Sequence, residues 1–201
     1  PERTVFILLT VHPDRLGETV RSRCMRVNFG GEADVQLEAS DAAWLKSFVG
    51  MSAETGEGLM GRYRLLGKLM EHLAAKRDTI EETQEAASAL NRYADIEPTL
   101  REKLKEELKA SIEAEYRRQR GQFLTGLQWW LRDIWLAALR QGRELLHFQD
   151  WADTSETVGQ RLSPGQALEN LQSIEATQRL LETTNVQEAL ALEVGLLKLK
   201  L

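Results

Sequence analysis

The stretch LQWWLRDIWLAAL, residues 127–139, is apolar around most of its circumference when it is arranged as a helix. Consecutive side chains of a helix point about 100° apart, so Trp129 and Trp130 cannot share one narrow face. A helix that is hydrophobic nearly all round is normally surrounded by other elements. This stretch therefore predicts a central helix in a helical bundle.

The segments on either side of it also have helical periodicity. Residues 59–93 carry an apolar stripe at 3.6-residue spacing, and Pro98 is typical of a first helical turn. Ser163 and Pro164 predict the start of a helix that runs to about Glu182. We expect a mainly α fold in which residues 98–200 form one compact helical bundle.

Glycine and asparagine suggest where these helices break. Gly121 and Gly126 are expected to interrupt or bend the long segment, and Gly142 to end it. Asn185 is expected to cap the last helix. Shorter helices are expected at 14–24 and 40–50.

The N-terminal stretch TVFILLT, residues 4–10, has a different character. Its unbroken β-branched and aromatic content predicts a buried strand. The chain offers no further segment of this kind to pair with it, and a buried strand must satisfy its backbone groups. We therefore expect this chain to be the C-terminal part of a longer protein whose sheet precedes residue 1.

Composition excludes several classes of protein. The 201 residues are 42% hydrophobic and 28% charged, with a formal net charge of −5. That balance argues against a uniformly basic nucleic-acid surface. No apolar run approaches the roughly 18 residues of a membrane span. A single cysteine permits no internal disulfide, so we expect a reducing, cytoplasmic location.

Several short motifs carry little functional information. GEGLMG, residues 56–61, matches a dinucleotide fingerprint only in its letters, because no strand precedes it. The three histidines and Cys24 lack the spacing of a metal site, and a pair formed by Cys24 and His12 has no third, orienting group. The basic cluster YRRQR, residues 116–120, is interpreted as a solvated face with ion pairs, with phosphate contact as the alternative.

One stretch is much more specific. The segment VHPDRLGETVRSRC, residues 11–24, resembles the "xxPxxLxxTIxSRC" segment that follows the sensor strand in the AAA+ domain of bacterial clamp-loader subunits. The shared positions are Pro13, Leu16, Thr19, Ser22, Arg23 and Cys24. Residues 130–139 and 161–199 are similar to the helical collar domain of the delta-prime type of DNA polymerase III clamp-loader subunit.

The resemblance implies a role for Arg23. In this family the arginine of the Ser-Arg-Cys motif reaches into a neighbouring subunit's ATP site, where it stabilises charge on the γ-phosphate as a trans arginine finger. Thr10 falls at the sensor position, and Ser22 and Cys24 are expected to pack or shape the loop. This chain contains no P-loop, so it is expected to be non-catalytic alone, with ATP and Mg²⁺ bound by neighbouring subunits.

The resemblance also implies a domain organisation and partners. Residues 1–30 would be the end of an AAA+ domain, 31–75 a reduced lid-like region and 76–201 the collar. Partners would be the gamma/tau and delta subunits and, through them, the sliding clamp and primer–template DNA, with no membrane. An intersubunit surface is expected on the tryptophan helix at Trp129, Trp130 and Trp135, with Arg132 and Asp133 near its polar edge.

Two other interpretations remain open. The chain could be a fragment of a gamma/tau-type clamp-loader ATPase, whose P-loop would lie upstream. It could also be an unrelated helical scaffold or adaptor in which the Ser-Arg-Cys stretch is accidental. Co-purification with a clamp-loader assembly would separate the scaffold from both subunit types.

Overall fold

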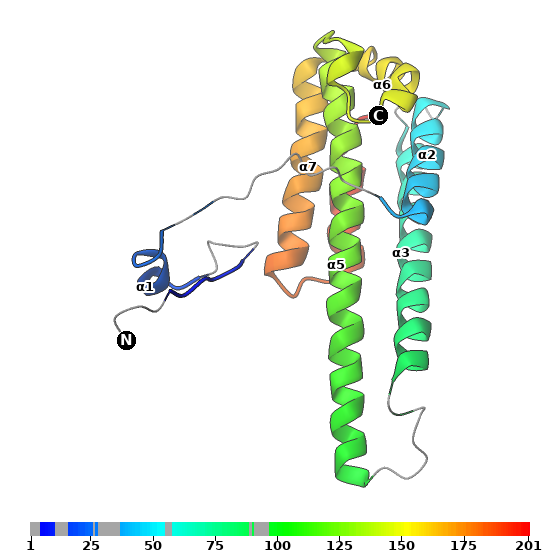
Figure 1. Cartoon of the computed structure of the whole chain (residues 1–201). Helices are drawn as coiled ribbons and strands as arrows, with labels where there is room; N and C mark the ends of the chain where they lie inside the picture. Colours follow the sequence, from blue (N-terminus) through cyan, green and yellow to red (C-terminus); the bar gives the residue numbers. More distant parts are fainter. Residues whose placement is uncertain are drawn as a thin grey trace. The chain divides into compact units, whose positions relative to one another are not determined.

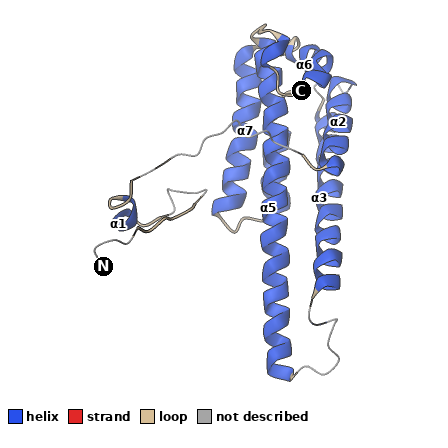
Figure 2. Cartoon of the chain, in the orientation of Figure 1, coloured by secondary structure: helices blue, strands red, loops and turns tan. Residues whose placement is uncertain are grey.

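The computed structural model describes residues 5–10, 16–25, 27, 37–54, 58–88, 90 and 97–201. These residues are mainly helical, and none of them forms a β-strand (Figures 1 and 2). The chain divides into two compact units, Pro1–Asp34 and Val35–Leu201. None of the described helices is both long enough and apolar enough to cross a membrane.

The first unit contains one short helix, α1 (Glu18–Arg21). The expected buried strand is not formed, since residues 5–10 have no strand conformation. Their side chains lie open, with Val5 to Leu9 between 57% and 86% exposed. A strand needs a hydrogen-bonding partner, and the described part of the chain supplies none. The helix expected at 14–24 is limited to α1 among the residues that are described there.

The second unit is a helical bundle built around one long helix, α5 (Pro98–Ala138) (Figure 1). Helices α3, α6 and α7 pack directly on it. The remaining elements of this unit are, with their bounds, α2 (Ala39–Glu54), α3 (Leu59–Ala87), η2 (Arg143–Leu145), η3 (Gln149–Trp151), α6 (Ala152–Gly159), α7 (Pro164–Thr183) and α8 (Glu188–Leu197).

The core lies where the second half of α5 meets its neighbours. Leu127, Trp130 and Ile134 of α5 are fully buried, as predicted for a central helix. They pack in one cluster with α2 and α3 residues that include Phe48 and Leu69. Each such side chain contributes roughly 1.5–3 kcal/mol relative to an exposed one. The expectation of a bundle over residues 98–200 is met, but the bundle also includes α2 and α3.

Gly121 and Gly126 do not interrupt α5, so the predicted interruption is wrong. The helix runs through both positions without interruption. A Cβ atom at Gly126 would lie 2.5 Å from Cδ2 of Leu37. The glycine at 126 therefore serves close packing of Leu37 against α5, and the bundle overrides the weak helix propensity of glycine.

Helix ends agree with the sequence where the signal is local. Ser163 caps α7 through a capping box with Gln166, as its sequence predicts. Two other ends differ from the prediction. The long helix ends at Ala138, before Gly142, and Arg140 takes a left-handed conformation with φ of 56°. The last helix starts at Glu188 after Gln187, so Asn185 is not its cap.

The expected domain division differs from the observed units. The boundary between residues 75 and 76 falls inside the continuous helix α3. Helices α2 and α3 pack on α5 within the single unit Val35–Leu201. The expected boundary near residue 30 lies close to the observed division after Asp34.

Candidate functional site

The Ser-Arg-Cys segment forms a compact turn at the end of α1. The carbonyl of Gly17 accepts hydrogen bonds from the amides of Val20, at 2.9 Å, and Arg21, at 3.2 Å. The Arg23 amide donates to the Val20 carbonyl at 3.1 Å. These backbone bonds hold residue 23 in a turn directly after the helix.

The side chain of Arg23 is exposed and makes no hydrogen bond or ion pair with any described residue. The Ser22 hydroxyl donates to the Thr19 carbonyl at 3.4 Å, so Ser22 shapes the turn rather than packing in a core. Cys24 is an exposed free thiol and Thr10 is exposed as well. His12 lies outside the described residues. The turn therefore presents Arg23 to solvent.

A second polar feature lies inside the bundle, around Lys76 of α3. Its side chain is only 5% exposed. The ammonium group lies 3.0 Å from Oε2 of Glu38, 3.1 Å from Oδ1 of Asp41 and 3.2 Å from Oε1 of Gln119. A buried ammonium is tolerated when it is paired and hydrogen-bonded in this way. Lys76 thus connects the start of α2 to α5.

His72 extends this network. Its Nε2 lies 2.7 Å from the same Asp41 oxygen that accepts from Lys76. The ring stacks on Trp44, with centroids 5.2 Å apart, and packs against Phe123 at 4.9 Å. The histidine is therefore held by a carboxylate and two aromatic rings, and these contacts account for its position.

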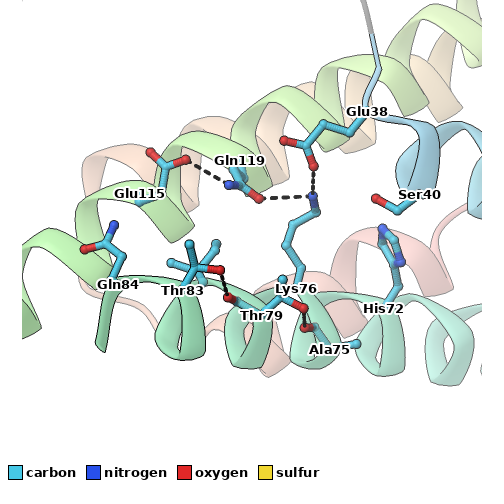
Figure 3. A pocket seen from close by; sticks show the side chains of 11 residues that line it. Glu38, Ser40, His72, Ala75, Lys76, Thr79, Thr83, Gln84, Glu115 and Gln119 are labelled. Atoms are coloured by element: carbon cyan, nitrogen blue, oxygen red, sulfur yellow. Dashed lines mark hydrogen bonds and ion pairs between the residues drawn. The ribbon is translucent and has the colours of Figure 1, made fainter. Parts of the chain in front are cut away.

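A pocket of about 430 Å³ opens beside this network. Its wall is formed by one face of α3 together with the start of α2 and Glu115 and Gln119 of α5 (Figure 3). Glu115 accepts hydrogen bonds from Arg118 and Gln119. The Arg118 guanidinium, followed by the Gln119 amide, lowers the pKa of Glu115 to about 2. None of these pocket residues was predicted from the sequence to form a site. His72 was considered only as one of the three histidines.

The three tryptophans of α5 differ in exposure. Trp130 is fully buried and packs edge-on against Phe48, so it cannot lie on an intersubunit surface. Trp129 and Trp135 are half-buried. One face of Trp129 is stacked on His147 at 4.8 Å, and the Arg132 guanidinium lies 5.2 Å from the ring centroid. Of the three tryptophans predicted to lie on an intersubunit surface, only Trp129 and Trp135 therefore retain exposed surface.

Asp133 was expected at the polar edge of this helix and is instead completely buried. Its carboxylate accepts hydrogen bonds from the amides of His147, at 2.9 Å, and Phe148, at 2.8 Å. Burial raises the pKa of Asp133, while the two backbone donors act in the opposite direction. The sequence signal for this contact was an acidic residue inside an otherwise apolar helix. The loop that Asp133 binds could not be predicted from the residues next to it in the sequence.

The basic cluster at 116–120 divides between surface and interior. Arg117 pairs with Glu113 at 3.1 Å, and Arg118 pairs with Glu115 at 2.5 Å. These surface pairs are those of the solvated-face interpretation. Two other members are buried and bind the same carboxylate of α8, namely Tyr116 and Arg120 with Glu188. Burial, followed by the hydrogen bond to Glu188, raises the pKa of Tyr116. The sequence did not predict this long-range contact with Glu188.

Other candidate motifs show no assembled site. Among the described residues, no group of three or more His, Cys, Asp or Glu side chains is placed to hold a metal ion. Gly58 precedes α3 and Leu59 begins it, so the described part of GEGLMG is the start of a helix. Residues 56 and 57 of that motif lie outside the described part.

Comparisons with family models, curated proteins and solved structures each found no match to this chain. Inference about its function therefore depends on its own residues and their geometry.

Proposed function

We propose that this chain is a delta-prime-like subunit of a bacterial DNA polymerase III clamp loader. In this role it supplies Arg23 in trans to the ATP site of a neighbouring subunit and uses its helical unit for assembly. The complex would load the sliding clamp onto primed DNA. The chain alone would not hydrolyse ATP, because the nucleotide and Mg²⁺ would be bound by the neighbour.

The observation that carries the proposal is the exposed Arg23 at the end of the motif VHPDRLGETVRSRC. Arginine suits phosphate because its planar fork donates two parallel hydrogen bonds and stays charged. A finger that acts in trans must be presented to solvent in the isolated subunit. The lack of an ion pair to Arg23 among the described residues supports this role over a structural ion pair within the chain.

The arrangement of the second unit is compatible with an assembly role. It is a helical bundle, as the collar proposal requires, and Trp129 and Trp135 retain exposed surface at one end of α5. We propose that these two side chains, without Trp130, contribute to the subunit contact. Half-buried tryptophans are frequent contributors to protein interfaces.

The test uses a clamp loader reconstituted with the chain at its full natural length. Arg23→Ala should reduce DNA-dependent ATP hydrolysis by at least about tenfold, because a trans finger is worth large rate factors. Subunit assembly, measured by size-exclusion chromatography, should be unchanged. Arg23→Lys should recover only part of the rate, because lysine keeps the charge and loses the fork.

Arg21→Ala is the matched control, since Arg21 is also exposed and lies two residues away. It should leave hydrolysis near the wild-type rate. Equal hydrolysis by the wild type and Arg23→Ala would remove Arg23 from the mechanism. Failure of the wild-type chain to co-purify with any clamp-loader subunit would overturn the proposal and favour the scaffold interpretation.

A further inference from the structure

The segment that follows α8 is held by the bundle in the manner of a bound peptide. Residues 199–201 are neither helix nor strand. Leu199 and Leu201 are only 2% and 6% exposed and belong to the main hydrophobic cluster, whereas Lys200 between them is only partly buried. This alternation of inward, outward and inward side chains is that of an extended chain.

The backbone of this segment is bound by one side chain of α7, that of Asn170. The Nδ2 atom of Asn170 donates to the carbonyl of Lys200 at 2.5 Å, and its Oδ1 atom accepts from the amide of Lys200 at 2.8 Å. Asn170 is 1% exposed, so both hydrogen bonds are shielded from water. An amide side chain that binds both backbone groups of one residue recognises an extended chain whatever side chain that residue carries.

The neighbours of Asn170 on α7 favour apolar side chains on either side of it. Ala167 and Ile174 lie three residues before and four residues after Asn170, so the three residues share one face of the helix. Both are fully buried and belong to the same hydrophobic cluster as Leu199 and Leu201. This face of α7 therefore combines a backbone-binding amide with apolar surface.

The side chain at the middle position contributes little to this selectivity. The ammonium of Lys200 lies 3.0 Å from Oε2 of Glu169, and the two side chains are 42% and 65% exposed. An ion pair with this exposure is weak and is screened by salt. The arrangement thus specifies two leucine-like side chains around one polar residue.

The segment is attached less firmly than the helices on which it lies. Its first amide, that of Leu199, donates to the carbonyl of Leu196 at the end of α8. Burial of two leucines and the hydrogen bonds to Asn170 must offset the conformational entropy that is lost when residues 199–201 become fixed. Short segments without secondary structure open at a lower free energy than packed helices. We therefore expect residues 199–201 to leave α7 while the bundle stays folded.

We infer that the face of α7 around Asn170 is a peptide-docking site, which residues 199–201 cover in this chain. Its ligand is an extended peptide of a partner protein in which two leucines flank one polar residue. That peptide replaces residues 199–201 and takes over the two hydrogen bonds of Asn170. The docking site is separate from the proposed arginine finger and does not depend on it.

Hydrogen exchange of the full wild-type chain tests the opening. The amide of Lys200 should be protected at least about tenfold less than the amide of Leu192, because the first is released by local opening and the second only when α8 unfolds. Equal protection of the two amides would show that the segment opens only together with α8, and would overturn the inference.

Peptide binding tests the docking site itself. The probe is a fluorescein-labelled Lys-Leu-Lys-Leu-amide, the sequence of residues 198–201, and its anisotropy is measured with the full chain. Leu199→Ser with Leu201→Ser weakens the covering segment, so this variant should bind the probe at least about tenfold more tightly than the wild type, in which the segment competes. Leu180→Ser with Leu190→Ser is the matched control, since both leucines are exposed, and it should bind like the wild type.

Further variants identify the groups that bind the probe. In the variant that lacks Leu199 and Leu201, Asn170→Ala removes both backbone hydrogen bonds and should weaken probe binding at least about tenfold. Glu169→Gln in the same background should change the affinity by less than about threefold, because its ion pair is exposed. A probe with serine in place of both leucines should bind at least about tenfold more weakly. Circular dichroism melting checks that each variant is folded.

Four results of these binding experiments would overturn the inference. One is the absence of saturable probe binding to the folded double leucine variant. Another is equal affinity for the leucine and serine probes. The third is unchanged affinity after Asn170→Ala, which would show that the probe binds an apolar surface elsewhere. The fourth is unfolding of the double leucine variant, since residues 199–201 would then be an essential part of the core and not a removable cover.

Discussion

Three polar residues that the sequence pattern would place at the surface are buried in the helical unit: Lys76, Arg120 and Asp133. Each has partners from a distant segment. Lys76 binds Glu38 and Asp41, Arg120 binds Glu188, and Asp133 binds the amides of residues 147 and 148. Desolvation of a charged group is costly, and these partners offset that cost. Such residues position helices and loops relative to one another.

The buried carboxylate of Asp133 leads to a prediction about stability. Asp133→Ala should lower the free energy of unfolding by about 2–4 kcal/mol, because two backbone amides would lose their buried acceptor. Asp133→Asn should cost less, since one amide oxygen can still accept one of the two hydrogen bonds. Urea denaturation measures both values. A loss below about 0.5 kcal/mol for the alanine variant, the range of ordinary surface changes, would contradict this account.

Among the elements, α5 carries most of the bundle and is the least uniform along its length. Its 41 residues span about 60 Å at 1.5 Å per residue. Near its start Leu100 is 49% exposed, whereas Leu127 and Ile134 near its end are fully buried. The stripe of leucines in the first half is thus only partly covered, and the second half contributes most of the packing. Amphipathic periodicity alone did not distinguish these two halves.

Close contacts between elements depend on glycines. A Cβ atom at Gly195 of α8 would lie 2.2 Å from Oγ1 of Thr177 in α7, so Gly195→Ala forces the two helices apart or displaces the threonine. We expect a loss of about 1–3 kcal/mol in the free energy of unfolding. Gly67→Ala in α3 is the control, because a Cβ atom at Gly67 would have no neighbour within 4 Å among the described residues.

The control should be neutral or stabilising by up to about 1 kcal/mol, because alanine favours helix over glycine. Adding Thr177→Ala to Gly195→Ala should relieve part of the clash. Thermal melts of the three variants decide the matter. Equal melting temperatures for Gly195→Ala and Gly67→Ala would show that the approach of α7 and α8 is not limited by this glycine.

At the scale of the whole molecule, the chain comprises two units with different packing. Every residue of the main hydrophobic cluster, including the side chains packed at its edge, lies between Leu37 and Leu201. The described residues of the first unit include no buried side chain. Stability of the helical unit is therefore expected to be independent of the first 34 residues.

Removal of residues 1–34 tests this expectation. The remaining chain should melt in one cooperative transition, within about 2 °C of the full chain, since a change of 1 kcal/mol shifts the melting temperature by roughly 2–4 °C at this size. Calorimetry of both proteins provides the comparison. A shortened chain that fails to fold, or that melts more than about 4 °C lower, would show that the first unit stabilises the second.

The sequence by itself determined the features that depend on neighbours along the chain. These include the helical class, the start of α5 at Pro98, the capping box at Ser163 and the central position of residues 127–139. They could be predicted because helix periodicity and caps involve side chains within a few positions of one another. The proposed role of Arg23 also rests on a continuous stretch of sequence; it stays a prediction, with which the exposure of Arg23 is compatible.

Only the tertiary structure decided which polar side chains are buried and which glycines allow close packing. Tyr116 meets Glu188 across 72 positions, and the partners of Lys76 are 35 to 43 positions away. Gly126 is required by Leu37, which lies in a different segment. The pocket beside Lys76 belongs to this group, since α2, α3 and α5 must pack before its wall exists. Local patterns contain no information about such distant partners, because burial and pairing are set by the way helices pack.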